Sequence, residues 1–340
     1  MAKVNAVGLE KNEYRGAPTT LCAGCGHNSI SNQIIQAAYD LSLIPEDVIK
    51  FSGIGCSSKS PTYFLGRSFG FNSLHGRMPS VATGALFGDA RLKAVAVSGD
   101  GDSTNIGIGQ FKHILRRNAP MVYIIENNGV YGLTKGQFSA TAEQGLTLKY
   151  QGANPYMPVD VIMEALVSQA TFVARSFAGD ATQVRELIKA ALSHDGLAIL
   201  DIISPCVTFN NADDARHSYG WAKEHQDPLH DFSFVPFEEE IEVEMVEGET
   251  RRVTMHDGSS IILKKLDEDY DPTNRKNAMD MIQQSYEEDV LMTGLIYINT
   301  EPDSLLDMHG LSQDEPLNRL GQEHLRPKKE AIDAVNAMMF

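Results

Sequence analysis

The chain has 340 residues, 42% of them hydrophobic, and a formal net charge of −16. A chain of this length and composition can bury a large core, as one big domain or two. The charge argues against a nucleic-acid partner, because a phosphate-binding surface needs clustered Lys and Arg. No apolar run approaches the roughly 18 residues that span a bilayer, and the start MAKVNAVGLEKNEY shows no signal peptide, so we expect a soluble cytoplasmic protein without a membrane partner.

The first two thirds of the chain alternate short apolar runs with helical patterns. Residues 1–20 lack periodicity and are expected to form an extended arm, and residues 27–41 have the apolar spacing of a helix. Continuously apolar strands between helices predict a doubly wound α/β fold with a mostly parallel sheet. The expected strands are VIKFSGIG, AVAVSGDGD, MVYIIENN, FVARSFAG and LAILDIIS, and the helices between them are expected at 104–117, 159–170 and 180–194.

The pattern changes from Trp221 onward. Residues 237–266 alternate apolar and polar residues around a turn at His256-Asp257-Gly258, which predicts a small hairpin or a meander. Residues 274–292 are expected to be helical, TGLIYINT to be one more strand, and residues 329–339 to be a short amphipathic helix. We therefore divide the chain into an arm (1–20), a binding domain (21–220) and an α+β extension (221–340) used for subunit packing. The acidic runs of this extension are expected to be a solvated face.

Unusual residues follow the expected strands, at the sheet edge where such folds bind ligands. One strand ends in Gly99-Asp100-Gly101-Asp102, and the next ends in Asn127-Asn128. The glycines let backbone N–H groups approach a phosphate. Magnesium prefers oxygen ligands, and Asp100, the amide oxygen of Asn128 and the carbonyl of Val130 suit that role. This pair of strand ends predicts a thiamin diphosphate site.

The four cysteines of the chain are Cys22, Cys25, Cys56 and Cys206. Four thiolates match the ligand count of a tetrahedral zinc site or of an iron–sulfur cluster. A redox dithiol would leave two of them unexplained, and disulfides are not expected without a signal peptide. Buried thiols also serve as small hydrophobes. The cysteines by themselves leave both the cluster and zinc open.

With these motifs the chain resembles the β subunit of a 2-oxoacid:ferredoxin oxidoreductase over roughly residues 15–235, through CAGCGH, GIGCSSK, LHGR, GDGDSTNIGIGQ, ENNGVYGLTKGQ and SPC. The resemblance implies the thiamin diphosphate-binding fold, with thiamin diphosphate, Mg²⁺ and one [4Fe–4S] cluster. By motif, the implied cluster ligands are Cys22, Cys25, Cys56 and Cys206. The implied thiamin diphosphate contacts are Ile54, Gly55, Cys56, Ser57, His75, Gly99, Asp100, Gly101, Asp102, Asn128, Gly132, Leu133 and Thr134.

Three residues acquire catalytic roles from the family alone. Lys59 would meet the substrate carboxylate, because a cation beside the cofactor suits an anionic 2-oxoacid. Leu133 would prop the cofactor, and His75 would donate to the diphosphate. The alternatives are a solvated lysine, an ordinary core leucine and a structural histidine.

The family also implies a reaction and partners. An oxoacid would be decarboxylated on the thiamin, coenzyme A would accept the acyl group, and electrons would pass through the cluster to ferredoxin. A separate α subunit would supply the ylid-promoting glutamate and the coenzyme A site, in an (αβ)₂ assembly. The segment WAKEHQDPLHDFSFVP favours 2-oxoglutarate over pyruvate. The rival hypotheses are a non-redox thiamin decarboxylase or carboligase and a zinc-stabilised scaffold subunit.

Overall fold

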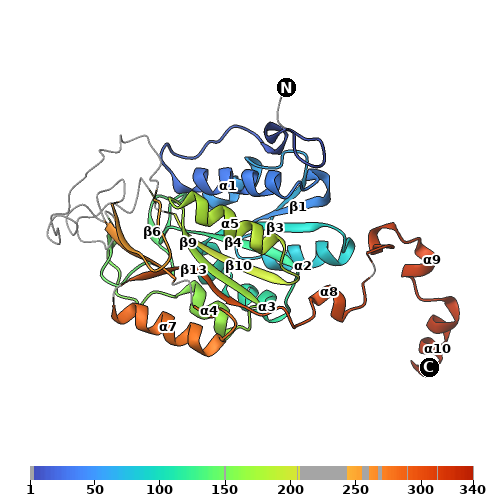
Figure 1. Cartoon of the computed structure of the whole chain (residues 1–340). Coiled ribbons are helices and arrows are strands. Elements are labelled where there is room, and N and C mark those ends of the chain that lie inside the picture. Colours follow the sequence, from blue (N-terminus) through green and yellow to red (C-terminus); the bar gives the residue numbers. More distant parts are fainter. Residues whose placement is uncertain are drawn as a thin grey trace.

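The computed structural model describes residues 4–148, 151–204, 206, 243–254, 260–266, 270–288, 290–311 and 313–339. Its centre is a sheet of nine strands in the order β11-β12-β13-β9-β10-β4-β3-β1-β2 (Figure 1). These strands are β1 (Val48–Ser52), β2 (Phe69–Asn72), β3 (Lys93–Gly99), β4 (Met121–Asn127), β9 (Phe172–Phe177), β10 (Leu197–Ile203), β11 (Thr250–Thr254), β12 (Ser260–Lys265) and β13 (Leu291–Ile298). Short pairs outside this sheet are β5 (Val130–Tyr131) with β6 (Gln137–Phe138), and β7 (Thr147–Leu148) with β8 (Gly152–Ala153).

Six neighbouring strands of this sheet run parallel to one another, in the spatial order β2, β1, β3, β4, β10, β9. β3, β4, β9 and β10 are almost entirely buried, because their apolar residues face helices on both sides of the sheet. The predicted doubly wound, mostly parallel α/β fold is confirmed. Since parallel strands end at a common edge, the loops after β1, β2, β3 and β4 meet there.

Helices cover both faces of the sheet (Figure 1). Alternate residues of β3 and β4 enter two separate cores: Val97 and Ile124 pack with α1 and α5, whereas Ala96 and Ile125 pack with the opposite layer. The first layer consists of α1 (Gly26–Asp40) and α5 (Ala181–Leu192). The second consists of α2 (Met78–Gly88), α3 (Ile108–Arg116), α4 (Val161–Val167) and α7 (Arg275–Glu287).

Two expected helices differ from the structure. In place of one helix over 104–117, a π-helical segment (Gly101–Ile106) is followed by α3, and the break falls at Gly107. The backbone of Gly76 packs there, and a Cβ on Gly107 would lie 2.9 Å from its Cα. The helix expected over 274–292 ends at Glu287, because Leu291 and Met292 instead pair with β12. The sequence reading also missed β2 and α2.

The N-terminal residues do not form the expected extended arm. The 3₁₀ turn η1 (Lys11–Tyr14) lies between two β-bridges, Val4 with Glu10 and Arg15 with Phe64. Tyr14 is completely buried, and its hydroxyl donates to the carbonyl of Leu43 (2.7 Å). One buried aromatic residue therefore holds a segment that has no periodicity of its own.

The C-terminal strands extend the central sheet. β13 runs antiparallel to β9, β12 pairs parallel with β13, and β11 pairs antiparallel with β12, which confirms the expected hairpin. Its turn at 256–258 and the segment 221–236 lie outside the described residues. Beyond β13, α8 (Leu305–Met308) still packs on the core through Leu305 and Leu306. The chain then continues through η5 (Leu317–Arg319) and leaves the body as an arm with α9 (Gln322–Leu325) and α10 (Lys329–Met339), so that it ends in a helix at the predicted position (Figure 1).

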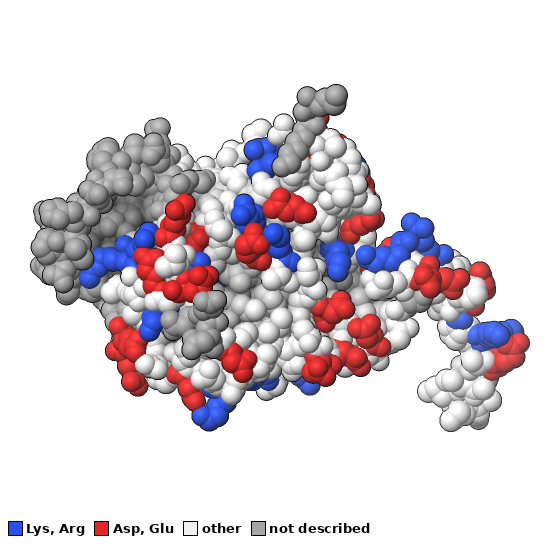
Figure 2. All heavy atoms as spheres, in the orientation of Figure 1, with Lys and Arg blue, Asp and Glu red and all other residues white. Residues whose placement is uncertain are grey.

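The surface carries charges of both signs. On the face shown in Figure 2, acidic and basic side chains of the described residues are interspersed, without a continuous basic area. A broad positive field for a nucleic-acid backbone is therefore missing from this face. No helix among the described residues is long and apolar enough to span a bilayer.

Candidate thiamin diphosphate site

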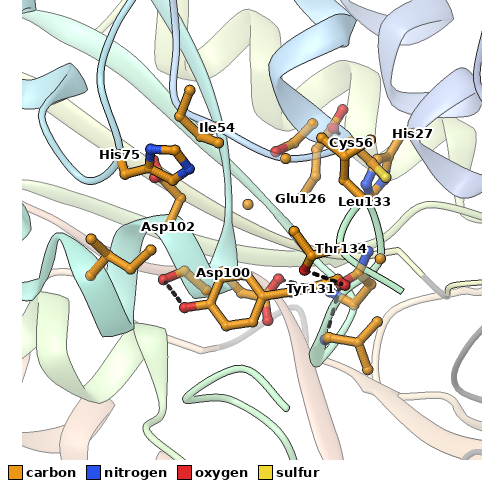
Figure 3. Close-up of a pocket in the computed structure, with 18 residues that line it drawn as sticks. His27, Ile54, Cys56, His75, Asp100, Asp102, Glu126, Tyr131, Leu133 and Thr134 are labelled. Atoms are coloured by element: carbon orange, nitrogen blue, oxygen red, sulfur yellow. Dashed lines mark hydrogen bonds and ion pairs between the residues drawn. The ribbon is translucent and has the colours of Figure 1, made fainter. Parts of the chain in front are cut away.

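The loops after β1, β2, β3 and β4 enclose a cavity of about 300 Å³. It opens at the edge of the sheet where ligands of open α/β sheets bind. All thirteen residues expected to contact thiamin diphosphate line this cavity. The lining consists of His27, Ile54, Gly55, Cys56, Ser57, His75, Gly99, Asp100, Gly101, Asp102, Ile106, Glu126, Asn128, Val130, Tyr131, Gly132, Leu133 and Thr134 (Figure 3).

The floor of the cavity depends on a glycine at position 101. A Cβ there would lie 2.5 Å from the ring of Tyr131, which is too close for any real contact. The Tyr131 hydroxyl donates to the carbonyl of Gly101 (2.9 Å), and in Figure 3 Tyr131 is drawn beside Asp100. The close approach of Tyr131 in the neighbouring loop therefore requires glycine at position 101, whether or not a phosphate is bound.

Asp100 is the buried carboxylate of this floor, with 1% of its surface exposed. Its Oδ2 accepts hydrogen bonds from the Gly129 N–H (3.1 Å) and from the hydroxyls of Thr141 (2.6 Å) and Ser139. Its Oδ1 has only a long contact with the N–H of Asn128 (3.4 Å). Burial raises the pKa of Asp100, and the two hydroxyls oppose that shift. Among the described residues, no Lys or Arg forms a salt bridge with it.

Asp102 holds the turn after β2 in place. Its Oδ1 accepts the N–H of Gly76 (2.7 Å), and its Oδ2 accepts the hydroxyl of Ser98 (2.8 Å). Gly76 has a φ of +65° and its backbone touches Gly107, so the turn after β2 is fixed in place. This turn places His75 on the cavity wall, at the opposite end from Cys56 (Figure 3).

At the other end, sequence reasoning missed a buried pair, His27 and Glu126. The carboxylate of Glu126 accepts the Ser60 hydroxyl (2.9 Å), and the His27 Nδ1 lies 2.5 Å from the Ser204 hydroxyl. Burial raises the pKa of Glu126 well above its usual range and lowers that of His27 to about 4. Their closest atoms are 3.7 Å apart, so we interpret them as two neutral groups and not as an ion pair.

A sequence signal for this pair existed. Glu126 is the one acid in β4, after a run of five residues without a charge, and His27 lies two residues after Cys25 of the Cys-x-x-Cys segment. An ionisable residue within a buried strand is rare unless it is partnered or functional. Tyr131 and Ile106, which also line the cavity, carry no comparable signal in the sequence.

The four cysteines lie near one another but do not converge on one point. Cys25 is 8% exposed, Cys22 is exposed, and Cys56 and Cys206 are half-buried. Burial raises the pKa of Cys25 to about 12, and the charges of Cys206 and Cys22 add to that rise. In the part of the chain that the structure describes, no three His, Cys, Asp or Glu side chains are close enough to hold a metal ion. This spacing does not match a preformed single-ion zinc site.

The predicted catalytic residues do not all reach the cavity. Leu133 lines it and remains 52% exposed, and His75 lines it as well, whereas Lys59 is not part of the lining. Lys59 lies on the 3₁₀ turn η3 (Ser57–Thr62), close enough to Cys56 to lower the pKa of that thiol against the effect of burial. The turn is anchored by the buried Lys50, which donates to the carbonyls of Pro61, Phe64 and Leu65 at 2.7–2.8 Å.

Residues 53–202, which carry this cavity, match the family described as the thiamine pyrophosphate enzyme C-terminal TPP binding domain. Residues 262–313 match a second family, described as the C-terminal part of the pyruvate ferredoxin oxidoreductase β subunit. The first match covers the loops of the site and its strands except β1, and the second covers most of β12, α7 and β13. Fold and sequence together therefore define a thiamine pyrophosphate-binding chain.

Individual relatives narrow the class. The 2-oxoacid:ferredoxin oxidoreductase subunit β of Saccharolobus solfataricus is 41% identical over 56% of this chain and 63% of that protein. The 2-oxoglutarate synthase subunit KorB of Methanocaldococcus jannaschii is 35% identical over 56% of this chain and 71% of that protein. The chain belongs to the family of 2-oxoacid:ferredoxin oxidoreductase β subunits, which confirms the resemblance seen in its motifs.

A solved structure extends the likeness to most of the chain. The 2-oxoglutarate:ferredoxin oxidoreductase from Magnetococcus marinus, with 2-oxoglutarate, coenzyme A and succinyl-CoA bound, is 29% identical. It aligns with a TM-score of 0.72 over 91% of this chain and 92% of that one. The alignment in the S. solfataricus relative spans less than two thirds of that protein.

Proposed function

We propose that the chain is the β subunit of a coenzyme A-dependent 2-oxoacid:ferredoxin oxidoreductase that acts on 2-oxoglutarate and yields succinyl-CoA and CO₂, or runs the reverse carboxylation. The observation that carries the proposal is the juxtaposition of the Asp100 cavity with Cys56 in its wall. One loop, residues 54–57, thus serves both the cavity and the cysteine set. A non-redox thiamin enzyme would need only the cavity, and a zinc scaffold only the cysteines.

The donors of the cavity fit a cation and a diphosphate. Asp100 is a buried carboxylate with one oxygen left for a metal, and Asn128 and Val130 line the same wall. Buried charge without a partner is costly, and a divalent ion would compensate it. We assign Mg²⁺ to Asp100, the Asn128 amide oxygen and the Val130 carbonyl. Thiamin diphosphate, when bound, would supply the carbanion chemistry of decarboxylation.

The chain's own residues would then orient the cofactor and enclose it. The backbone around Gly101 would bind the diphosphate, and His75, held by the Asp102–Gly76 contact, would donate to it from the far wall. Leu133 and Ile106, both about half exposed, would bury their apolar faces against the cofactor and keep water out. For Lys59 we retain the role of meeting the substrate carboxylate, from a position at the rim near Cys56.

The cysteines fit an iron–sulfur cluster better than a single ion. A cluster is larger than one zinc ion, so its four ligands need not converge as closely. In the chain alone the raised pKa values of Cys25 and Cys56 keep these thiols protonated, and binding iron would release their protons. We assign Cys22, Cys25, Cys56 and Cys206 as the ligands of one [4Fe–4S] cluster, which would accept electrons singly and pass them to ferredoxin. Reduced thiols fit a cytoplasmic location.

We infer that activity requires an α subunit. The M. jannaschii and S. solfataricus relatives are themselves named as subunits. The ylid-promoting glutamate and the coenzyme A site are proposed to come from that partner, in an (αβ)₂ assembly. The isolated chain should therefore bind thiamin diphosphate without releasing CO₂ from any oxoacid, whereas the reconstituted complex should turn over.

The substrate proposal has one alternative, pyruvate. Two proteins similar to this chain carry 2-oxoglutarate in their names, whereas the C-terminal family match carries pyruvate. The test is coenzyme A-dependent reduction of a viologen dye by the complex with each oxoacid in turn. Faster turnover with pyruvate at equal concentration would overturn the assignment of 2-oxoglutarate.

The cofactors are tested by anaerobic purification. We expect about four irons and four sulfides per chain and a dithionite-reducible EPR signal. Variants in which Ser replaces one cysteine should lose iron, and Cys56→Ser should also weaken thiamin diphosphate binding because Cys56 lines the cavity. Zinc in place of iron would support the scaffold hypothesis, and thiamin-dependent turnover without iron would support the carboligase.

A further inference from the structure

The two oxygens of Asp100 are surrounded unequally. Oδ2 accepts three hydrogen bonds, from the Gly129 N–H and from the hydroxyls of Ser139 and Thr141. Within the described part of the chain, Oδ1 receives one weak contact of 3.4 Å, longer than an ordinary N–H···O bond. A carboxylate held in this way cannot rotate without breaking three contacts. Oδ1 is therefore the oxygen directed to any ligand in the cavity.

The two hydroxyls come from a segment that does not line the cavity. Ser139 and Thr141 follow the strand β6, and the backbone of Ser139 is fixed by its N–H, which donates to the carbonyl of Gly129 (3.1 Å). Ser139 is 5% exposed. Both side chains thus approach Asp100 from behind, on the side away from the cavity, where they contact the carboxylate without blocking it.

Thr141 stands between two acceptors. Its Oγ1 lies 2.6 Å from Oδ2 of Asp100 and 2.9 Å from Oδ1 of Asn127. A hydroxyl has one proton to donate, and a charged acceptor at the shorter distance takes it. Asn127 is itself held by Asp201, to which its Nδ2 donates (3.0 Å). The Thr141 hydroxyl therefore packs against Asn127, a side chain that Asp201 already holds in place.

We propose that Ser139 and Thr141 are positioning residues of the cation site: they hold Oδ2 of Asp100 so that Oδ1 alone meets a divalent ion. The inference rests on the proposed function, because it needs a cation at Asp100. Neither residue lines the cavity, so neither would touch the ion or the cofactor. Residues that orient a metal ligand in this manner typically contribute about 10- to 100-fold to metal affinity.

The test measures Mn²⁺ binding, used in place of Mg²⁺ because free Mn²⁺ is counted directly by its EPR signal. The full chain, in the complex in which it purifies, is titrated with Mn²⁺ in the presence of thiamin diphosphate. We expect Thr141→Val to raise the Mn²⁺ Kd by about 10- to 100-fold and Ser139→Ala to raise it as well. Thr141→Ser, which keeps the hydroxyl, should restore most of the affinity.

The matched control is Thr171→Val, the same change at a buried threonine of the opposite sheet edge. The Thr171 hydroxyl contacts Oδ1 of Asn118 (2.7 Å) and Nε2 of His194 (2.8 Å), so its loss should lower stability without changing the Mn²⁺ Kd. Equal affinity in Thr141→Val and wild type would overturn the inference while the proposed function stands. A wild-type complex that binds neither Mn²⁺ nor thiamin diphosphate would remove the proposed function, and the inference with it.

Discussion

Two buried acidic centres lie on opposite sides of β4, and they differ in whether a cationic side chain faces them. Behind the cavity, Arg175 on β9 pairs with Asp201 on β10 (2.9 Å) and with Asp160, the N-cap of α4 (2.6 Å). Asp100 at the end of β3 has hydroxyl and N–H donors but no cationic side chain among the described residues. The first centre is complete within the chain, whereas the proposed Mg²⁺ would complete the second.

The pKa values follow this division at Asp160 but not at Asp201, whose pKa is raised by burial although Arg175 acts to lower it. Burial acts to raise the pKa of Asp160, but the Arg175 guanidinium outweighs it and the pKa falls. At Asp100 burial prevails over the hydrogen bonds and the pKa rises. A buried carboxylate that the protein leaves without a counter-charge indicates a binding site, whereas a compensated one indicates architecture.

Removing Arg175 should have the largest effect on stability. Arg175→Met leaves the buried Asp201 and the partly buried Asp160 without a cation, and we expect a loss of about 3–5 kcal/mol in the free energy of unfolding, measured by denaturant titration. The triple variant Arg175→Met, Asp160→Asn, Asp201→Asn removes all three charges and should recover much of that loss. A single variant as stable as wild type would contradict the role of the pair.

Asp100→Asn should separate binding from stability. Without divalent ions we expect the variant to unfold close to wild type, because no ion pair is broken. With Mg²⁺ and thiamin diphosphate at about 100 times Kd, wild type should gain about 2.7 kcal/mol, and the variant should gain almost nothing. The measurement is thermal unfolding with and without ligands. An equal gain in both proteins would show that the cation does not bind at Asp100.

Gly101→Ala should have a smaller effect than Asp100→Asn, because it changes the packing of the cavity and not its charge. The new methyl group would press on the Tyr131 ring, and overpacking of this kind costs about 1–3 kcal/mol. Gly109 on α3 is the matched control, since a Cβ there meets nothing within 4 Å. Gly109→Ala should be neutral or slightly stabilising. Calorimetric titration with thiamin diphosphate should show weaker binding in Gly101→Ala alone.

The smallest expected effect on stability is that of replacing His194, at the amino edge of the sheet, and this effect depends on pH. Burial lowers the pKa of His194 below its usual 6.5. The unfolded chain therefore binds a proton more readily, so this residue's contribution is complete above pH 6.5 and is lost as the pH falls toward the lowered value. His194→Gln should show a flatter stability profile between pH 7 and 5. Parallel profiles would contradict the shift.

The sequence located most of the site because its motifs occur at strand ends. Apolar runs predicted β1, β3 and β4, and parallel strands bring GIGCSS, GDGD and ENNGVYGLT to one edge. The helix α2 was missed because small residues and Pro79 give it no clear amphipathic spacing. β2 was missed because it has only four residues, two of which, Gly70 and Asn72, are of types depleted in strands.

What escaped prediction depends on the return of distant segments. Ser139 and Thr141 meet Asp100 only because β5 and β6 pair and turn the chain back. His27 meets Glu126 and Ser204 because α1 packs over the ends of β4 and β10. Spacing along the chain does not encode such contacts. Lys59 illustrates the converse, because its proximity to Cys56 in sequence does not place it in the cavity lining.

The antiparallel pairing of β13 with β9 has a consequence for how the chain is made. Val173 on β9 pairs with Tyr297, which leaves the ribosome long after the parallel strands are complete. Until then β9 is an open, apolar sheet edge, which other chains can join. Synthesis thus passes through a stage with an aggregation-prone border. A chaperone, slow translation or low temperature during expression should raise the yield of intact protein, and truncation before β13 should leave it insoluble.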